Sequence, residues 1–218
     1  MIRRQPPDLH FEISSWQSGL GRLAGLDEAG RGAWAGPVSA AAVILPAEAE
    51  LTTTLAGVRD SKQMTPPERT RWAVVIQKTA LAWGVGMASH AEVDQLGIVP
   101  ATRLAMRRAL EQLSIPPEAL LIDALHLPEF NLPQNVILHG DALCLSIAAA
   151  SVLAKTARDA LMTVMETTYP QYGFARHKGY GTSFHRAALE RLGPCKIHRQ
   201  TFAPIRKYLA SGESRALP

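Results

Sequence analysis

The sequence predicts a mixed α/β domain with a central β-sheet flanked by helices. Short apolar runs of strand length alternate along the chain with longer segments of helical periodicity or helix-forming composition. Hydrophobic residues make up 47% of the 218 residues and charged residues 19%, which supplies enough apolar surface for a substantial core. This composition excludes a disordered or fibrous chain.

Five apolar runs predict strands, at residues 23–27, 38–45, 81–88, 119–125 and 135–139. A glycine-rich segment joins the first two, which favours an antiparallel return through a wide loop. The fourth run is almost continuously apolar, as in a strand that is buried on both faces.

Four segments predict helices, at residues 66–79, 99–113, 142–168 and 182–192. The first opens with Thr65, two prolines and Glu68, a typical helix start. Gly193 and Pro194 end the last one.

The domain organisation follows from the absence of any linker long enough to divide the chain. We expect one body over residues 21–210. Residues 1–20 are polar and aperiodic and are expected to be poorly structured, and residues 211–218 are expected to form a flexible tail.

Several classes of protein are excluded. No apolar run reaches the roughly 18 to 20 residues that span a bilayer, and the first ten residues lack the apolar core of a secretory signal. Cys144 and Cys195 are too few for a disulfide framework, so we expect a cytoplasmic protein, and nothing suggests an obligate dimer. The formal charge of +4 admits nucleic acid as a partner without requiring it.

Acidic residues stand at the ends of the predicted strands. Asp27 and Glu28 end the first strand, Asp123 interrupts the fourth, and Asp141 follows the fifth. A carboxylate in an apolar strand is costly unless it is paired or binds a cation. Four converging carboxylates, with no Cys or His cluster, favour Mg²⁺ or Mn²⁺ over zinc. Two such ions about 4 Å apart would activate a water and stabilise the leaving oxygen of a phosphodiester.

Each acid also has a structural interpretation. Asp141 stands where it could simply be the N-cap of the following helix. Asp27 and Glu28 could form a solvated corner at the end of a strand. Asp123, between Ile122 and Ala124, has few structural explanations and is the strongest functional candidate of the four.

Two segments have the composition of a polynucleotide contact. Gly30 and Gly32 flank Arg31, so that the backbone there could approach a ligand closely, although an ordinary glycine turn has the same composition. Lys178 and Tyr180 combine a cation with a ring held between glycines, which suits a phosphate and a stacked sugar or base. A solvated loop is the alternative.

Two further lysines have alternative interpretations. Lys62 lies in a turn and would contact a phosphate if the turn faces the acids. Lys155 stands four residues from Asp159 on the long helix, where an intrahelical pair is expected and a phosphate contact is the alternative.

Together these residues resemble the type 2 ribonuclease H family, the ribonuclease HII enzymes. The similarity covers about residues 21–208. It rests on motifs in the family's order: DEAGRG at 27–32, DSK at 60–62, LID at 121–123, GD at 140–141, IAAASVLAK at 147–155, RD at 158–159, KGYGT at 178–182 and HR at 198–199. Arg31 favours this branch over the related type 3 enzymes, which usually carry lysine there.

The resemblance implies a ribonuclease H-like mixed sheet with a helical C-terminal extension. It also implies a metal-dependent endoribonuclease that hydrolyses the RNA strand of RNA/DNA hybrids and cuts 5′ of ribonucleotides embedded in duplex DNA, leaving 5′-phosphate and 3′-hydroxyl ends. A replication or repair partner is left unspecified.

The same resemblance assigns roles to residues. The acids Asp27, Glu28, Asp123 and Asp141 become the catalytic metal ligands. The loop that senses the ribose 2′-hydroxyl, the group that separates RNA from DNA, is formed by Gly30, Arg31 and Gly32, with Tyr180 stacking beside the sugar. The lysines expected to bind substrate are Lys62, Lys155 and Lys178.

The sequence departs from the family pattern at two positions. Ala124 replaces the usual glycine after the third acid, which puts the local backbone in question, and the asparagine often found before Ile98 is missing.

Rival functions remain. A non-catalytic binding module would have lost an acid, and none is missing. A ribonuclease H-like DNA nuclease or integrase would share the acids, but the loop and Tyr180 argue against it.

Overall fold

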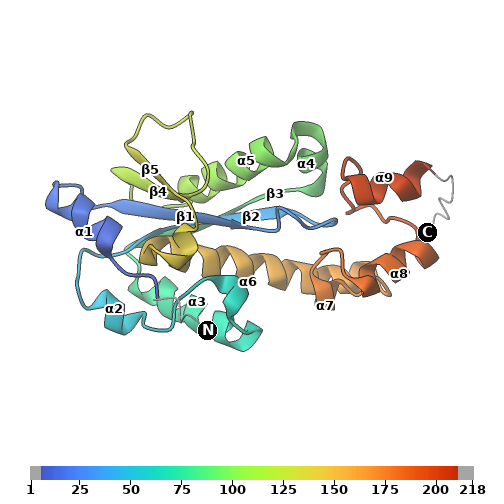
Figure 1. The fold of residues 1–218 in the computed structure, drawn as a ribbon, viewed down its shortest axis with the longest axis horizontal. Helices are drawn as coiled ribbons and strands as arrows, with labels where there is room; N and C mark the ends of the chain where they lie inside the picture. The colour runs from blue at the N-terminus through green and yellow to red at the C-terminus, as the bar shows by residue number, and fades with distance from the viewer. Residues whose placement is uncertain (1–5, 211–218) are drawn as a thin grey trace.

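The computed structural model describes residues 6–210, which form three layers (Figure 1). A five-stranded sheet lies in the middle, with α4 and α5 on one face and α3 and α6 on the other. The bounds of the helices are α1 His10–Gln17, α2 Leu51–Thr54, α3 Pro66–Thr79, α4 His90–Leu96, α5 Ile98–Glu111, α6 Leu145–Thr168, α7 Phe174–His177, α8 Ser183–Leu192 and α9 Ala203–Ala210. The distal half of α6 runs past the sheet into the region of α7 and α8, which confirms the predicted helical C-terminal extension.

The sheet is mixed, as predicted. Its strands are β1 Leu23–Ala29, β2 Val38–Ile44, β3 Ala82–Ala88, β4 Ala119–Asp123 and β5 Gln134–Ile137, in the spatial order β3-β2-β1-β4-β5. Strands β1, β2 and β3 pair antiparallel, so the predicted return after β1 is confirmed. Strands β1, β4 and β5 pair parallel, and their carboxyl ends therefore meet at one edge.

The first residues of α3, α4 and α5 differ in how they are capped. Thr65 and Glu68 form a complete capping box at the start of α3, which confirms the predicted helix start. Ser89 and Glu92 form another at α4, a helix that is not among those predicted. Helix α5 starts at Ile98 after Gly97, which offers no side-chain cap, in keeping with the missing asparagine.

The hydrophobic core lies on both faces of the sheet. The buried alanines of α6, among them Ala148, Ala149 and Ala150, allow this helix to pack closely beneath the strands. On the other face, a Cβ on Gly86 would lie 2.2 Å from the Ala105 carbonyl oxygen of α5. The glycine that weakens β3 therefore permits the close approach of α5. Within residues 6–210, no helix is long and apolar enough to cross a membrane.

The expectation of a poorly structured segment over residues 1–20 is wrong for its described part. Helix α1 occupies His10–Gln17, and Glu12 in it is only 1% exposed. Its Oε1 accepts hydrogen bonds from the Ser146 amide at 2.7 Å and the Cys144 thiol at 3.1 Å, while the Asp8 carbonyl accepts from the Leu145 amide at 2.9 Å. The first amides of a helix have no partner inside it. The start of α6 therefore orders the N-terminal segment, a long-range pairing that local periodicity cannot reveal.

The expected tail at 211–218 lies outside the described residues. Helix α6 begins at Leu145 and not at the predicted Ala142, which is the last residue of a separate 3-10 turn at Gly140–Ala142.

Replacing Glu12 with alanine should lower the free energy of unfolding by about 1–3 kcal/mol, because the buried Ser146 amide loses its acceptor. Glu12→Gln keeps an acceptor oxygen and should lose less. Urea unfolding of both variants, with Glu48→Ala at an exposed position as the control, measures the difference. If Glu12→Ala is as stable as the control, the capping role is rejected.

Candidate active site

The carboxyl edge of the parallel strands brings two acids level with each other. Leu26 of β1 pairs with Ile122 of β4, so the next step in the same register sets Asp27 beside Asp123. Asp27 is 2% exposed. Edges of this kind, where parallel strands end, are where α/β sheets bind ligands.

The other two acids approach from flanking segments. Asp141 lies in the 3-10 turn after β5 and is 6% exposed, and the preceding Gly140 amide donates to Asp123 Oδ1 at 2.8 Å. Glu28 Oε1 forms an ion pair with Arg31 at 3.3 Å. The interpretation of Asp141 as a helix N-cap is wrong, because Cys144 occupies the N-cap position of α6.

The electrostatics of these acids indicate that they act on one another. Burial raises the pKa of Asp27 well above its ordinary value, and the charges of Glu28 and Asp123 raise it further. Burial raises the pKa of Glu28, and Asp123 adds to this against the opposing charge of Arg31. Burial also raises the pKa of Asp141, together with Asp60 and Asp123. The carboxylates therefore share one field that favours a cation.

The donor set fits a hard divalent cation. All four groups offer carboxylate oxygens, and Asp27 Oδ2 and Glu28 Oε2 are buried without a hydrogen-bond partner. As they stand, no three Asp, Glu, His or Cys side chains within residues 6–210 form a group that could hold an ion. Glu28 is turned toward Arg31 and Asp141 toward Lys62, so closing around a cation requires these pairs to open.

Lys62 lies in a turn that faces the acids, which is the arrangement that a phosphate contact requires. Its Nζ lies 3.5 Å from Asp141 Oδ2, and the side chain is 72% exposed. Partial burial opposes its charge, but Asp141, Asp27 and Asp60 outweigh this and raise the pKa of Lys62. The turn that carries it is fixed to α6 through a 2.9 Å hydrogen bond between the Ser61 and Ser151 hydroxyls.

The glycine loop follows β1 directly. Gly30 has a φ of +93°, and a Cβ there would lie 2.0 Å from Arg158 Nε, so only glycine fits. Gly32 is exposed with open space around it, and the Arg31 side chain is 37% exposed. The loop thus presents accessible backbone next to Glu28.

Tyr180 lies in a turn that α6 and α8 support. Lys155 Nζ and Arg158 Cζ each lie 5.4 Å from the centre of its ring, and His185 Nδ1 is 3.0 Å from its carbonyl oxygen. The two residues that flank the ring from α6 are therefore cations.

The other two predicted lysines bind within the protein. Lys155 Nζ donates to Asp159 at 2.6 Å, which confirms the intrahelical pair. Lys178 Nζ donates to Thr163 Oγ1 and the Ala175 carbonyl, both at 2.6 Å. Their part in substrate binding stays a prediction.

Sequence reasoning missed Arg158 and Arg199 as site residues. Both are fully buried behind the glycine loop. Their partners lie 120 or more residues away in most cases, for example Pro37 for Arg158 and Arg31 for Arg199. Only the motifs RD and HR marked these positions, and no local spacing distinguishes such arginines from surface ones.

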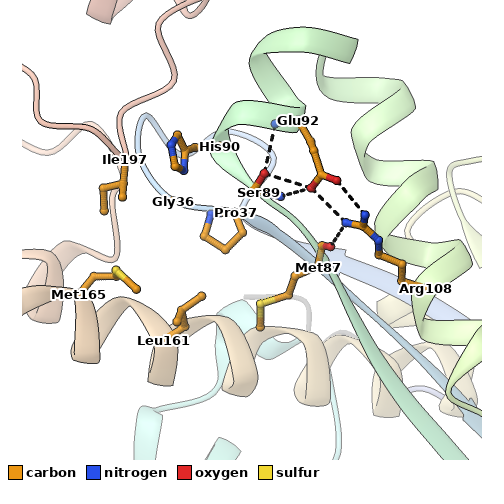
Figure 2. A pocket seen from close by; sticks show the side chains of 10 residues that line it. All are labelled: Gly36, Pro37, Met87, Ser89, His90, Glu92, Arg108, Leu161, Met165 and Ile197. Atoms are coloured by element: carbon orange, nitrogen blue, oxygen red, sulfur yellow. Dashed lines mark hydrogen bonds and ion pairs between the residues drawn. The ribbon is translucent and has the colours of Figure 1, made fainter.

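A separate pocket of about 370 Å³ opens behind the end of the loop (Figure 2). Gly36 and Pro37 line it together with Leu161 and Met165 of α6, and the ion pair of Glu92 with Arg108 borders it. None of the four acids lines this pocket. It is distinct from the carboxylate edge.

Comparison with known proteins decides the family. The family model for ribonuclease HII matches residues 24–205. A ribonuclease HII of Synechococcus sp. (strain JA-3-3Ab) is 54% identical over 207 residues, covering 95% of this chain and 92% of the relative. Another, of Chloroflexus aurantiacus, is 51% identical over 208 residues, covering 95% and 98%. The chain belongs to the ribonuclease HII family. It is a ribonuclease H-type hydrolase, an endoribonuclease that acts on RNA/DNA hybrids and on ribonucleotides in DNA.

Solved structures support the ribonuclease HII fold. Ribonuclease H2 from Pyrococcus horikoshii OT3 superposes with a TM-score of 0.73 at 23% identity, covering 87% of this chain and 98% of the other. A Bst-RNase HIII solved in complex with Mn²⁺ gives 0.69 at 21% identity, covering 93% and 74%. An RNase HII from Archaeoglobus fulgidus, solved in complex with PCNA, gives 0.68 at 23% identity, covering 83% and 95%.

The departure at Ala124 has a clear conformational cost in this ribonuclease HII. Its φ is +53°, in the left-handed region that favours glycine, and it directly follows Asp123. A residue with a Cβ loses about 1–2 kcal/mol there.

Ala124→Gly should therefore raise the free energy of unfolding by about 0.5–1 kcal/mol, after the larger entropy of glycine in the unfolded chain is allowed for. Ala187→Gly, at an exposed position in α8, should lower it by a similar amount and is the matched control. Equal losses in the two variants, measured by urea unfolding, would contradict the strain at Ala124.

Proposed function

We propose that Asp27, Glu28, Asp123 and Asp141 are the catalytic metal ligands of this ribonuclease HII. The observation that supports the proposal most strongly is the register of β1 and β4, which sets two of these acids level at the sheet edge. The buried oxygens of Asp27 and Glu28 that lack hydrogen-bond partners are the ones a cation would take.

The reaction is hydrolysis of the phosphodiester on the 5′ side of a ribonucleotide. A water attacks the phosphorus, the bond to the 3′ oxygen of the preceding nucleotide breaks, and the products carry 5′-phosphate and 3′-hydroxyl ends. Two ions, Mg²⁺ or Mn²⁺, would supply activation of the water and stabilisation of the leaving oxygen. The Bst-RNase HIII structure with Mn²⁺ is consistent with this choice.

The glycine loop and the Tyr180 turn would select the ribonucleotide. The loop of Gly30, Arg31 and Gly32, in which Gly32 is exposed, would contact the 2′-hydroxyl, which is donor and acceptor at once. The Tyr180 ring would stack beside the same sugar. Lys62, which is largely exposed and next to Asp141, is the best placed of the predicted lysines to meet the phosphate.

We also propose the partners, the oligomeric state and the location of the enzyme. Its partners are RNA/DNA hybrid and ribonucleotide-containing duplex DNA, and it acts as a monomer in the cytoplasm. The relative in complex with PCNA makes a replication protein a candidate partner class.

Asp27→Asn and Asp123→Asn should each reduce cleavage of a duplex that contains one ribonucleotide by at least about a hundredfold in Mn²⁺, because a ligand loses its charge. Both variants should stay folded, with thermal midpoints in EDTA no lower than that of the wild type, because each removes a repelling charge. Binding of a hybrid duplex should persist.

The matched control is Glu111→Gln on the exposed side of α5, which should cleave at the wild-type rate. Unchanged turnover in either aspartate variant would exclude that residue as a ligand. Failure of the wild type to cut the ribonucleotide duplex, or equal cutting of an all-DNA duplex, would overturn the proposed specificity.

Tyr180→Ala should lower the rate at a single ribonucleotide in DNA by about 5- to 150-fold, which corresponds to a stacking contact of about 1–3 kcal/mol. Tyr180→Phe keeps the ring and should stay near the wild-type rate. Single-turnover kinetics on the same duplex measures both. Equal rates for wild type and Tyr180→Ala would reject the stacking role.

A further inference from the structure

Arg158 on α6 is fully buried, yet its hydrogen bonds go to main-chain carbonyls. Its Nε donates to the Pro37 carbonyl at 2.8 Å, its Nη1 to the Lys178 carbonyl at 2.8 Å, and its Nη2 to the Ala35 carbonyl at 3.0 Å. Buried charges are usually paired with an opposite charge because desolvation is costly. A guanidinium that is instead spread over three carbonyls fixes the backbone that carries them.

Arg199 also donates to main-chain carbonyls of the same loop. Also fully buried, it donates from Nε to the Gly36 carbonyl at 3.0 Å and from Nη1 to the Arg31 carbonyl at 2.8 Å. Its own amide donates to the Trp34 carbonyl at 2.8 Å. The two side chains together therefore bind four carbonyls within residues 31–37, and Arg158 adds one from the Tyr180 turn.

Arg158 also touches both parts that would meet the ribose. Its Nε lies 2.0 Å from the position that a Cβ of Gly30 would take, and its Cζ lies 5.4 Å from the centre of the Tyr180 ring. Arg158 thus links the glycine loop to the Tyr180 ring, beside the direct hydrogen bond from the Trp34 amide to the Gly179 carbonyl at 2.8 Å. A fold that needed only to attach the C-terminal extension could do so with apolar contacts, which cost no desolvation of charge.

We propose that Arg158, with Arg199 as a second anchor, is a positioning residue that fixes the spacing between the glycine loop and the Tyr180 ring for selection of a single ribonucleotide. This inference rests on the proposed roles of the loop and of Tyr180. The arginines touch no substrate themselves and act through the backbone and the ring that they hold.

Arg158→Lys tests the proposal because lysine keeps the charge but cannot donate in three fixed directions. On a duplex with one ribonucleotide, kcat should fall about 10- to 100-fold, the cost of a small misplacement of reacting groups, while KM changes less than about threefold. Arg22→Lys, which replaces an arginine bonded to Pro116 and Glu118 before the start of β1, is the control and should keep wild-type kinetics.

Trp34 offers a readout that activity does not. It lies inside the loop, and the other tryptophans are Trp16, Trp72 and Trp83. In protein labelled with 5-fluorotryptophan, Arg158→Lys should shift or broaden the ¹⁹F resonance of Trp34 and leave the other three in place. If all four resonances collapse, the variant has unfolded, and Arg199→Lys then takes its place with the same expected pattern.

The double variant Arg158→Lys, Tyr180→Ala completes the test. If Arg158 acts through the ring, the combined loss in kcat is smaller than the product of the single losses. If Arg158→Lys stays within twofold of wild type while Tyr180→Ala is impaired, or if Trp34 does not respond, the positioning role is overturned and the proposed function stands. If Tyr180→Ala cleaves at the wild-type rate, the proposed role of Tyr180 in ribose recognition is rejected, and the positioning role that rests on it is rejected too.

Discussion

The structure depends on keeping like charges together at the end of a buried sheet. Asp27 and Asp123 stand level because β1 and β4 run parallel in a fixed register, and a shift of one residue would turn one of them to the opposite face. Burial and mutual repulsion raise the pKa of Asp27, so the acids oppose the compact state unless a cation joins them. The apolar packing of α5 and α6 on the two faces of the sheet holds the register against this repulsion.

Helix α6 transmits that order to the rest of the site. Its first amides bind the N-terminal segment, Ser151 bonds to the turn that carries Lys62, and Arg158 reaches the glycine loop. Asp159 adds a half-buried link, because it pairs with both Lys155 and Arg69, and Arg69 in turn donates to the Ser61 carbonyl. One rigid helix therefore sets the relative positions of segments that are far apart in the sequence.

The sequence predicts the parts of this arrangement that are encoded locally. Asp123 could be found because a charge in an apolar strand needs a reason, and α3 because Thr65 and Glu68 form a recognisable start. The arginines behind the loop and the capping of α6 by Glu12 could not be found, because each pairs with groups more than a hundred residues away. Asp141 is predicted only in part. Its position before a helix fits an N-cap, and only the 3-10 turn shows that the helix starts later.

The C-terminal extension complements the acidic edge in charge. Residues 171–210 hold eight of the 23 Lys and Arg residues but only Glu190 of the 19 Asp and Glu residues. Its buried histidines do not add to this charge: burial lowers the pKa of His198 to about 3 and that of His185 to about 4, and their Nε2 atoms lie 3.0 Å apart, a spacing that suits a neutral donor and acceptor. Neutral histidines beneath the Tyr180 turn avoid further repulsion of Arg158 and Arg199. The region behind the glycine loop can then keep two buried guanidiniums that donate to main-chain carbonyls.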